Sequence, residues 1–206
     1  MAPNLKYEKA LWAEGKETVC GIDEVGRGSW AGPLFVGAVV FDENCKRIRG
    51  ADDSKSLTAM QRERIYKEIR KRARACAIGR AEHYEIDSLG MTKATNLAIK
   101  RAIEALKIKV DMLLIDAFSY NEIDSMGIKG GDEICYSISC ASILAKVERD
   151  KHISEVPEAS VYNFDKNKGY GTKEHRELIK KYGVSSIHRK SFKPIKELSG
   201  SNGLQK

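Results

Sequence analysis

The chain has 206 residues, of which 42% are hydrophobic and 32% charged, and 36 lysines and arginines against 29 acids give a net charge of +7. This length suits one domain with a sizeable core and is too short for two. No apolar run approaches the ~20 residues of a membrane-spanning helix, and the N-terminus lacks a signal peptide's apolar core, so we expect a cytoplasmic protein that binds no membrane.

The apolar periodicity predicts a strand hairpin followed by alternating helices and strands. In chain order we expect a helix over 5–14, strands over 19–24 and 34–41, a helix from 58 to about 70, a strand over 75–81, a helix over 92–106, a strand over 112–115, and helices over 137–155 and 172–182. This order is typical of an α/β domain with a mixed sheet. We expect one domain over 1–198 and a disordered tail over 199–206.

Acidic residues stand beside buried structure at three places. Asp23 and Glu24 lie between Ile22 and Val25, Asp116 follows four apolar residues, and Asp132 precedes the long apolar helix. Burying like charges costs several kcal/mol unless a cation compensates, and carboxylates are the ligands that Mg²⁺ and Mn²⁺ prefer. If they converge, the four acids could hold two ions roughly 3.5–4 Å apart. Each acid alone could equally be a helix cap or a surface charge.

The five cysteines are scattered and show no CxxC spacing, which argues against a zinc site or a disulfide framework. Gly26-Arg27-Gly28 lacks the spacing of a dinucleotide loop and leads into a strand. We interpret it as a loop whose backbone can approach a nucleic acid closely; a plain tight turn would leave Arg27 unexplained.

Basic residues are interleaved with aromatic ones between residues 166 and 196. Such a mixture suits phosphate contact combined with stacking on sugars or bases. A solvated helix face with ordinary lysines explains this segment equally well.

With these residues in view, the chain resembles bacterial ribonuclease HII, a type 2 RNase H family, from about Val19 to about Ile195. The blocks that carry the resemblance are Gly21-Ile22-Asp23-Glu24-Val25-Gly26-Arg27-Gly28 with Ala31-Gly32-Pro33, Asp53-Ser54-Lys55-Ser56-Leu57, Leu114-Ile115-Asp116, Lys129-Gly130-Gly131-Asp132, residues 141–150, Lys168-Gly169-Tyr170-Gly171-Thr172 and His188-Arg189-Lys190-Ser191-Phe192. So many ordered blocks make a chance similarity very improbable.

The resemblance implies an RNase H-like fold, a mixed central sheet flanked by helices, with a C-terminal helical extension over about 160–198. It implies an endonuclease that cleaves the RNA strand of RNA–DNA hybrids and incises at single ribonucleotides in duplex DNA. Two metal ions, Mn²⁺ or Mg²⁺, would promote hydrolysis that leaves a 5′-phosphate and a 3′-hydroxyl. The implied biological role is ribonucleotide removal from DNA.

The resemblance also assigns residue roles. Asp23, Glu24, Asp116 and Asp132 would bind the metals and carry catalysis. The backbone of Gly26, Arg27 and Gly28 would read the 2′-hydroxyl, and Tyr170 would pack on the adjacent deoxyribose. Further nucleic-acid contacts are expected at Ser54, Lys55, Lys146 and Lys168. For Lys146 and Tyr170, a helix lysine and a half-buried surface aromatic are the ordinary alternatives.

The chain departs from the family pattern at a few positions away from the acids. Ser29-Trp30 replaces the commoner Pro-Leu, Ser56 replaces a lysine, Ala117 replaces a glycine, and Asn167 stands where histidine is frequent. These departures leave the chemistry intact and bear on substrate preference.

Three rival interpretations remain open. Ribonuclease HIII shares the acids but carries an extra N-terminal domain, whereas only 18 residues precede the first predicted strand. A non-catalytic hybrid-binding module would not need carboxylates facing phosphates. An unrelated two-metal nuclease or resolvase on the same fold would lack the 2′-hydroxyl loop. We expect a monomer. A sliding-clamp interaction stays open, although the C-terminus shows no convincing clamp-binding peptide.

Overall fold

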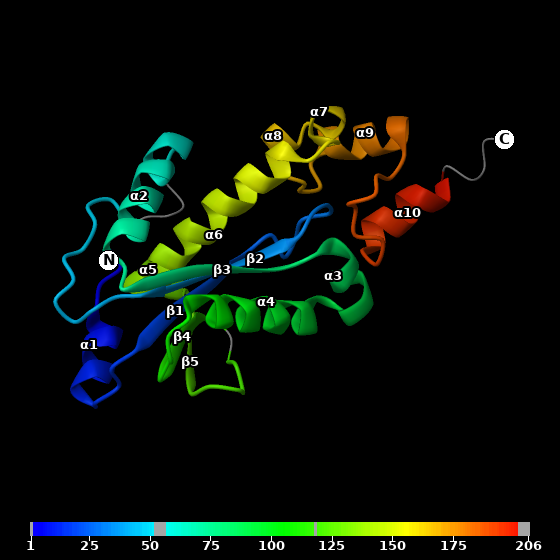
Figure 1. The fold of residues 1–206 in the computed structure, drawn as a ribbon. Coiled ribbons are helices and arrows are strands. Elements are labelled where there is room, and N and C mark those ends of the chain that lie inside the picture. The colour runs from blue at the N-terminus through cyan, green and yellow to red at the C-terminus, as the bar shows by residue number, and fades with distance from the viewer. Residues whose placement is uncertain (1, 52–56, 118, 202–206) are drawn as a thin grey trace.

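The computed structural model describes residues 2–51, 57–117 and 119–201, and its centre is a mixed five-stranded sheet (Figure 1). The strands are β1 (Val19–Val25), β2 (Leu34–Val40), β3 (Ala75–Ala81), β4 (Met112–Asp116) and β5 (Ser125–Ile128), in the order β3-β2-β1-β4-β5. The β1–β2 and β2–β3 pairs are antiparallel, and β1–β4 and β4–β5 are parallel. The predicted hairpin and mixed sheet are therefore confirmed.

Two long helices cover the two faces of the sheet. Helix α4 (Met91–Leu106) lies on one face and α6 (Tyr136–Glu155) on the other, with α2 (Ala59–Arg72) beside α6 (Figure 1). Helix α6 approaches closely because β1 and β2 present glycines there: a Cβ on Gly37 would lie 2.2 Å from the Ala141 carbonyl oxygen. The smaller elements before α6 are α1 (Lys6–Ala13), α3 (His83–Leu89) and α5 (Gly131–Ile134).

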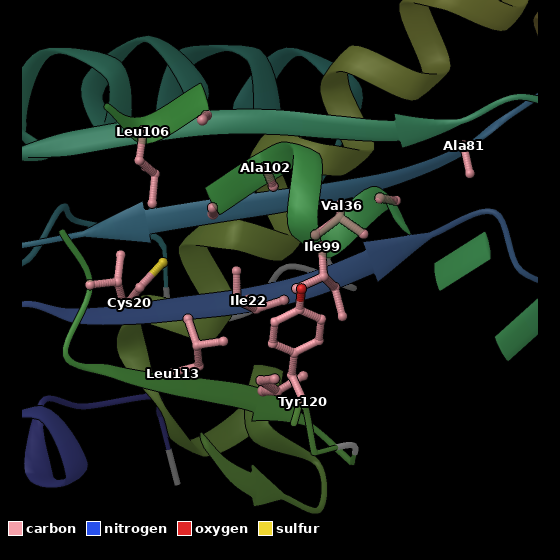
Figure 2. Close-up of a cluster of buried hydrophobic side chains, with 14 of the residues drawn as sticks. Cys20, Ile22, Val36, Ala81, Ile99, Ala102, Leu106, Leu113 and Tyr120 are labelled. Carbon is pink, nitrogen blue, oxygen red and sulfur yellow. The ribbon is translucent and has the colours of Figure 1, made fainter. Parts of the chain in front are cut away.

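Alternation along the strands builds a separate apolar core on each face. Figure 2 shows the α4 side, where Cys20 and Ile22 of β1 meet Leu113 of β4 and the helix residues Ile99 and Ala102. The opposite core joins side chains of β2, α2 and α6, including Val39, Ile65, Ile69, Tyr136 and Leu144. Both faces of the central strands are thus covered, as their near-continuous apolar sequences predict.

The C-terminal helices form a third apolar cluster at the end of the sheet where β1 finishes. They are α7 (Ala159–Tyr162), α8 (Phe164–Asn167), α9 (Lys173–Tyr182) and α10 (Lys193–Ser201). Trp30, from the loop between β1 and β2, belongs to this cluster together with Phe164 and Ile179. The Trp30 backbone N–H donates to Gly169 at 2.8 Å, and its carbonyl accepts from Arg189 at 2.8 Å. The loop that follows the first two acids is therefore held by the C-terminal helices.

The structure corrects the prediction for the start of the tail. Ser199-Gly200-Ser201 was expected to be disordered, but α10 continues through Ser201. The polar composition of these residues conceals the anchors that precede them, because Ile195 and Leu198 are buried in the third cluster. The remaining tail, residues 202–206, lies outside the described part of the chain.

Most short elements were not predicted from the sequence, whereas the ends of the long helices and strands were predicted to within one or two residues. Strand β5 was not expected because three of its four residues remain at least partly exposed and show no apolar alternation. In the residues that the structure describes, no helix has the length and apolar character needed to cross a membrane.

Candidate active site

The parallel pairing of β1 with β4 brings the predicted acids together. Ile22 pairs with Ile115, so the residues that follow them, Asp23 and Asp116, are neighbours at the same end of the sheet. Carboxyl ends of adjacent parallel strands are where ligands collect in α/β folds. Glu24 is next on β1, so the register joins acids that lie more than ninety positions apart in the sequence.

Asp132 reaches this place by way of the short helix α5. The backbone N–H of Gly131 donates to Asp116 Oδ1 at 2.7 Å, which fixes the start of α5 against the end of β4. Asp132 follows directly and is 7% exposed. Asp23, Glu24 and Asp116 therefore lie at the carboxyl ends of adjacent strands, and Asp132 follows the residue that binds Asp116.

The electrostatics of this edge are unfavourable for bare carboxylates. Burial, and then the nearby charges of Glu24 and Asp116, raise the pKa of Asp23 well above its usual value, although a Ser142 hydrogen bond works in the opposite direction. Burial and the Asp116 charge raise the pKa of Glu24 to about 7, and the Arg27 charge opposes them. Arg27 Nε lies 3.8 Å from Glu24 Oε1. The repulsion among these acids is what a bound cation would relieve.

The donor set suits a hard divalent ion. Within the described residues, no three His, Cys, Asp or Glu side chains are close enough to enclose a metal by themselves. Mg²⁺ keeps several waters and needs only one or two carboxylates at a time, so an open group of acids is compatible with it. Carboxylates with raised pKa values at a sheet edge fit such an ion, whereas the scattered cysteines do not contribute to this edge.

The Gly26-Arg27-Gly28 segment starts directly after β1, two residues from Glu24. Gly26 has a positive φ of 98°, and a Cβ there would lie 2.5 Å from Arg149 Nε. Gly28 differs, because it is exposed, has no left-handed φ, and a Cβ on it would meet no atom within 4 Å. Of these two glycines, the fold itself requires only Gly26, whereas a side chain at position 28 would meet open space.

Tyr170 lies beside this loop. A β-bridge joins Tyr170 to Ser29, and the Arg149 guanidinium carbon lies 5.0 Å from the centre of the Tyr170 ring. Arg149 is 1% exposed, and its Nη2 donates to Ser29 Oγ at 2.7 Å and to the Lys168 carbonyl at 2.6 Å. One buried cation thus contacts both the glycine loop and the segment that carries Tyr170.

Comparison with known proteins agrees with this geometry. The sequence profile of the ribonuclease HII family matches residues 20–195. Ribonuclease HII of Caldicellulosiruptor bescii is 46% identical over 190 residues, covering 91% of this chain and 92% of the relative. The chain belongs to the ribonuclease HII family. It is accordingly an RNase H endonuclease that degrades the RNA of RNA–DNA hybrids.

Solved structures show the same fold. Ribonuclease H2 from Pyrococcus horikoshii OT3 superposes with a TM-score of 0.75 at 26% identity, covering 91% of this chain and 100% of the other. The RNase HII of Archaeoglobus fulgidus, solved in a complex with PCNA, gives 0.69 at 25% identity, with coverage of 87% and 96%. Bst-RNase HIII, solved with Mn²⁺, gives 0.68 at 19% identity, with coverage of 93% and 71%. The RNase H-like fold implied by the sequence is therefore confirmed.

Two of the lysines predicted to contact phosphate have polar partners within the protein. Lys146 Nζ pairs with Asp150 Oδ1 at 2.9 Å, and Lys168 Nζ donates to Ser154 Oγ at 3.0 Å. Both ammonium groups are thus engaged within the protein. Ser54 and Lys55 lie outside the described residues.

Several buried polar residues around the site were not predicted from the sequence. Ser142 on α6 hydrogen-bonds Asp23, and Arg189 Nη1 donates to the Arg27 carbonyl at 2.9 Å. Arg149 and Arg189 are both essentially buried. The only signal available in the sequence was that these residues lie inside family-like blocks, because nothing local shows that an arginine will be buried.

Proposed function

We propose that this enzyme incises at single ribonucleotides embedded in duplex DNA, in addition to degrading RNA–DNA hybrids, and so acts in ribonucleotide removal. One observation carries the proposal: the glycine loop directly follows the strand that carries Asp23 and Glu24, and the β-bridge from Ser29, next to that loop, leads to Tyr170. A group that distinguishes ribose from deoxyribose therefore adjoins the group that would cut.

The acids would hold two divalent ions, Mg²⁺ or Mn²⁺, through Asp23, Glu24, Asp116 and Asp132. Ions held there would lower the pKa of a water and neutralise charge on the phosphodiester. Attack of that water on phosphorus with the 3′-oxygen as the leaving group would give a 5′-phosphate and a 3′-hydroxyl. The protein's own contribution is orientation. Asp23 Oδ1 accepts from the Glu24 backbone N–H at 2.8 Å, and Gly131 holds Asp116 in the same way.

Selectivity would come from the two sides of the ribose–deoxyribose junction. The 2′-hydroxyl is both a donor and an acceptor, so backbone groups of Gly26, Arg27 and Gly28 can recognise it directly. The exposed, unobstructed position of Gly28 leaves room for a sugar. Tyr170, half-buried beside the loop, would pack against the next deoxyribose, which lacks the hydroxyl.

The lysines would contribute through phosphates. Lys146 lies one helical turn beyond Ser142 on α6, on the same face as the side chain that contacts Asp23. A phosphate could compete with Asp150 for the ammonium group of Lys146. In the same way, a phosphate could replace Ser154 as the partner of Lys168. Ser54 and Lys55 are proposed for this role from the sequence resemblance alone.

The decisive experiment is digestion of three duplexes: DNA with one ribonucleotide, a uniform RNA–DNA hybrid, and DNA alone. Each is incubated with Mg²⁺, with Mn²⁺ or with chelator, and the cut ends are mapped. We expect metal-dependent cleavage of the first two duplexes, with 5′-phosphate ends. Cleavage of the hybrid with no incision at the single ribonucleotide would overturn the proposal, as would cleavage that persists in chelator.

A further inference from the structure

Two buried histidines of the C-terminal part are hydrogen-bonded to each other, and nothing in the proposed chemistry uses them. His175 lies in the first turn of α9 and His188 lies between α9 and α10, and both are 0% exposed. Their Nε2 atoms are 3.0 Å apart. The rings of Trp30, Tyr162 and Phe164 surround the pair. Two nitrogens at this distance in an apolar surrounding must share a single proton.

The groups at the two ends of this pair determine where every proton lies. The Ser185 backbone N–H can only donate, and it lies 2.9 Å from His188 Nδ1, so that nitrogen carries no proton. The proton of a neutral His188 is therefore on Nε2, and it donates to His175 Nε2. His175 then carries its own proton on Nδ1, which donates to the Tyr170 carbonyl at 2.9 Å. One pair of neutral tautomers satisfies all three hydrogen bonds.

A second proton is disfavoured in this arrangement. Between the rings it would bring two N–H groups together. On His188 Nδ1 it would meet the Ser185 N–H and leave only the Ser185 hydroxyl, 2.7 Å away, as an acceptor. Burial lowers the pKa of His175, and burial followed by the His175 charge lowers the pKa of His188 to about 3. The directions of these shifts agree with the donor and acceptor argument. The pair is thus a directional chain of hydrogen bonds that runs from Ser185 to Tyr170.

The Tyr170 peptide is held at both of its polar groups. Its carbonyl also accepts from the Thr172 N–H at 2.8 Å, and its own N–H donates to the Asn167 carbonyl at 2.9 Å. Thr172 caps α9 by accepting from the His175 N–H at 3.1 Å. His175 therefore acts twice on the short segment that presents the Tyr170 ring, once through its backbone and once through its ring.

We infer that His188 and His175 are positioning residues that fix Tyr170 and thereby determine how strongly the enzyme prefers a ribose–deoxyribose junction. This inference rests on the junction-reading role proposed above for Tyr170. The histidines touch neither the substrate nor the acids in this account. The effect of the two imidazole rings is transmitted through the carbonyl of Tyr170, so it falls on the substrate that needs Tyr170 most.

The test compares two substitutions at one position. His175→Leu removes the N–H that the Tyr170 carbonyl accepts, whereas His175→Asn retains an amide N–H close to the position of Nδ1. The readout is kcat/KM on a duplex with one embedded ribonucleotide divided by kcat/KM on a uniform hybrid. We expect His175→Leu to lower this ratio about three- to tenfold, the range for one net hydrogen bond, and His175→Asn to retain most of it.

Two further variants separate the possible causes. Ile195→Ala, which removes a 1% exposed side chain from the same apolar cluster, controls for general destabilisation. It should lower the melting temperature and leave the substrate ratio unchanged. Tyr170→Ala tests the proposed function itself. If Tyr170→Ala lowers the ratio and His175→Leu does not, the inference alone is wrong; if Tyr170→Ala has no effect, the junction role fails and the inference fails with it.

If the leucine variant does not fold, nitrogen NMR of the unmodified enzyme tests the protonation states of His175 and His188 on which the inference depends. At neutral pH, His188 should show a bare Nδ1 and His175 a protonated Nδ1, with one proton on each ring. A bare Nδ1 on His175, or two protons on either ring, would contradict the chain of hydrogen bonds and overturn the inference.

Discussion

At the scale of single residues, the site contains a buried acid that destabilises the fold and two departures from the family pattern that the fold accommodates. Asp23 is 6% exposed and faces two other acids, which no stability argument explains. Ala117 adopts a left-handed φ of 57°, which accounts for the glycine that is usual at this position. Ser29, another departure from the family pattern, replaces a proline with a hydroxyl that binds Arg149.

Asp23→Asn should abolish cleavage and stabilise the metal-free protein. Asparagine removes one of three mutually repelling charges, so we expect at least about a hundredfold loss of activity and retained binding to hybrid. In chelator at pH 8, above the pKa of about 7 that Glu24 has, the free energy of unfolding should rise by roughly 1–3 kcal/mol. Asp116→Asn should likewise abolish cleavage. Activity assays and denaturant titration check this, and persistent activity in either variant would contradict the assignment.

The two glycines of the loop should respond differently to alanine. Gly26→Ala forces a methyl against Arg149 at a positive φ, so we expect a loss of about 1–3 kcal/mol of stability. Gly28→Ala meets open space, so stability should stay within about 0.5 kcal/mol while cleavage falls several-fold. Thermal unfolding and kcat/KM measured on both variants test this pair. Full activity in Gly28→Ala would show that the substrate does not approach that residue closely.

At the scale of elements, the loop between β1 and β2 connects the sheet to the C-terminal helices. Gly32 N–H donates to the Ile187 carbonyl at 2.9 Å, and Arg189 Nε donates to the Gly32 carbonyl at 3.0 Å. Trp30 packs in the C-terminal cluster, and the Arg176 guanidinium carbon lies 5.1 Å from its ring centre. The helices after residue 160 therefore do more than add a basic surface, because they set the conformation of the loop.

The C-terminal cluster should lose stability in mild acid. Above about pH 6.5 the histidines are neutral in both the folded and the unfolded chain. Below it, the unfolded chain binds protons that His175 and His188 cannot accept when folded, so stability falls as the pH drops toward their lowered pKa values. The slope approaches about 1.4 kcal/mol per pH unit for each histidine.

Fluorescence of Trp30 can measure this loss. The chain has two tryptophans, so Trp12→Phe leaves Trp30 as the reporter of the cluster. Denaturant unfolding between pH 7.5 and 5.0 should show the decline, and His188→Gln should flatten it. His152→Gln is the comparison: the pKa of His152 is also lowered, but this side chain on α6 is only half-buried, so its replacement should flatten the decline less. An equal flattening by both variants would contradict the assignment.

At the scale of the whole molecule, catalysis and stability are linked through the sheet edge. The acids come from β1, β4 and α5, whose mutual placement depends on the complete sheet and on α6 packed behind it. A cation that binds only the folded arrangement must stabilise the entire domain.

Mn²⁺ or Mg²⁺ should therefore raise the melting temperature. At a metal concentration of 100 times Kd, the free energy of unfolding should increase by about 2.7 kcal/mol. Asp116→Asn should lose most of this increase, although its stability in chelator need not fall. Calorimetry with and without metal makes the comparison, with Lys16→Gln, at the opposite end of β1, as a surface control that keeps the full effect. A metal-induced increase of equal size in Asp116→Asn would place the ion elsewhere.

Local patterns by themselves determined the long helices, the central strands and the acids beside them. Apolar periodicity reports burial directly, and carboxylates next to Ile22 or Ile115 are anomalous without any knowledge of distant residues. The same local logic located the glycine loop, although not the different reasons for its two glycines.

Only the tertiary structure decided which polar residues are buried and what they hold. Arg149 meets Ser29, Arg189 meets Arg27, and His188 meets His175 through contacts between separate segments. Whether a charged or polar side chain can be buried depends on partners that the fold supplies. Periodicity carries information about one element, whereas hydrogen-bond complementarity exists only once the elements have met.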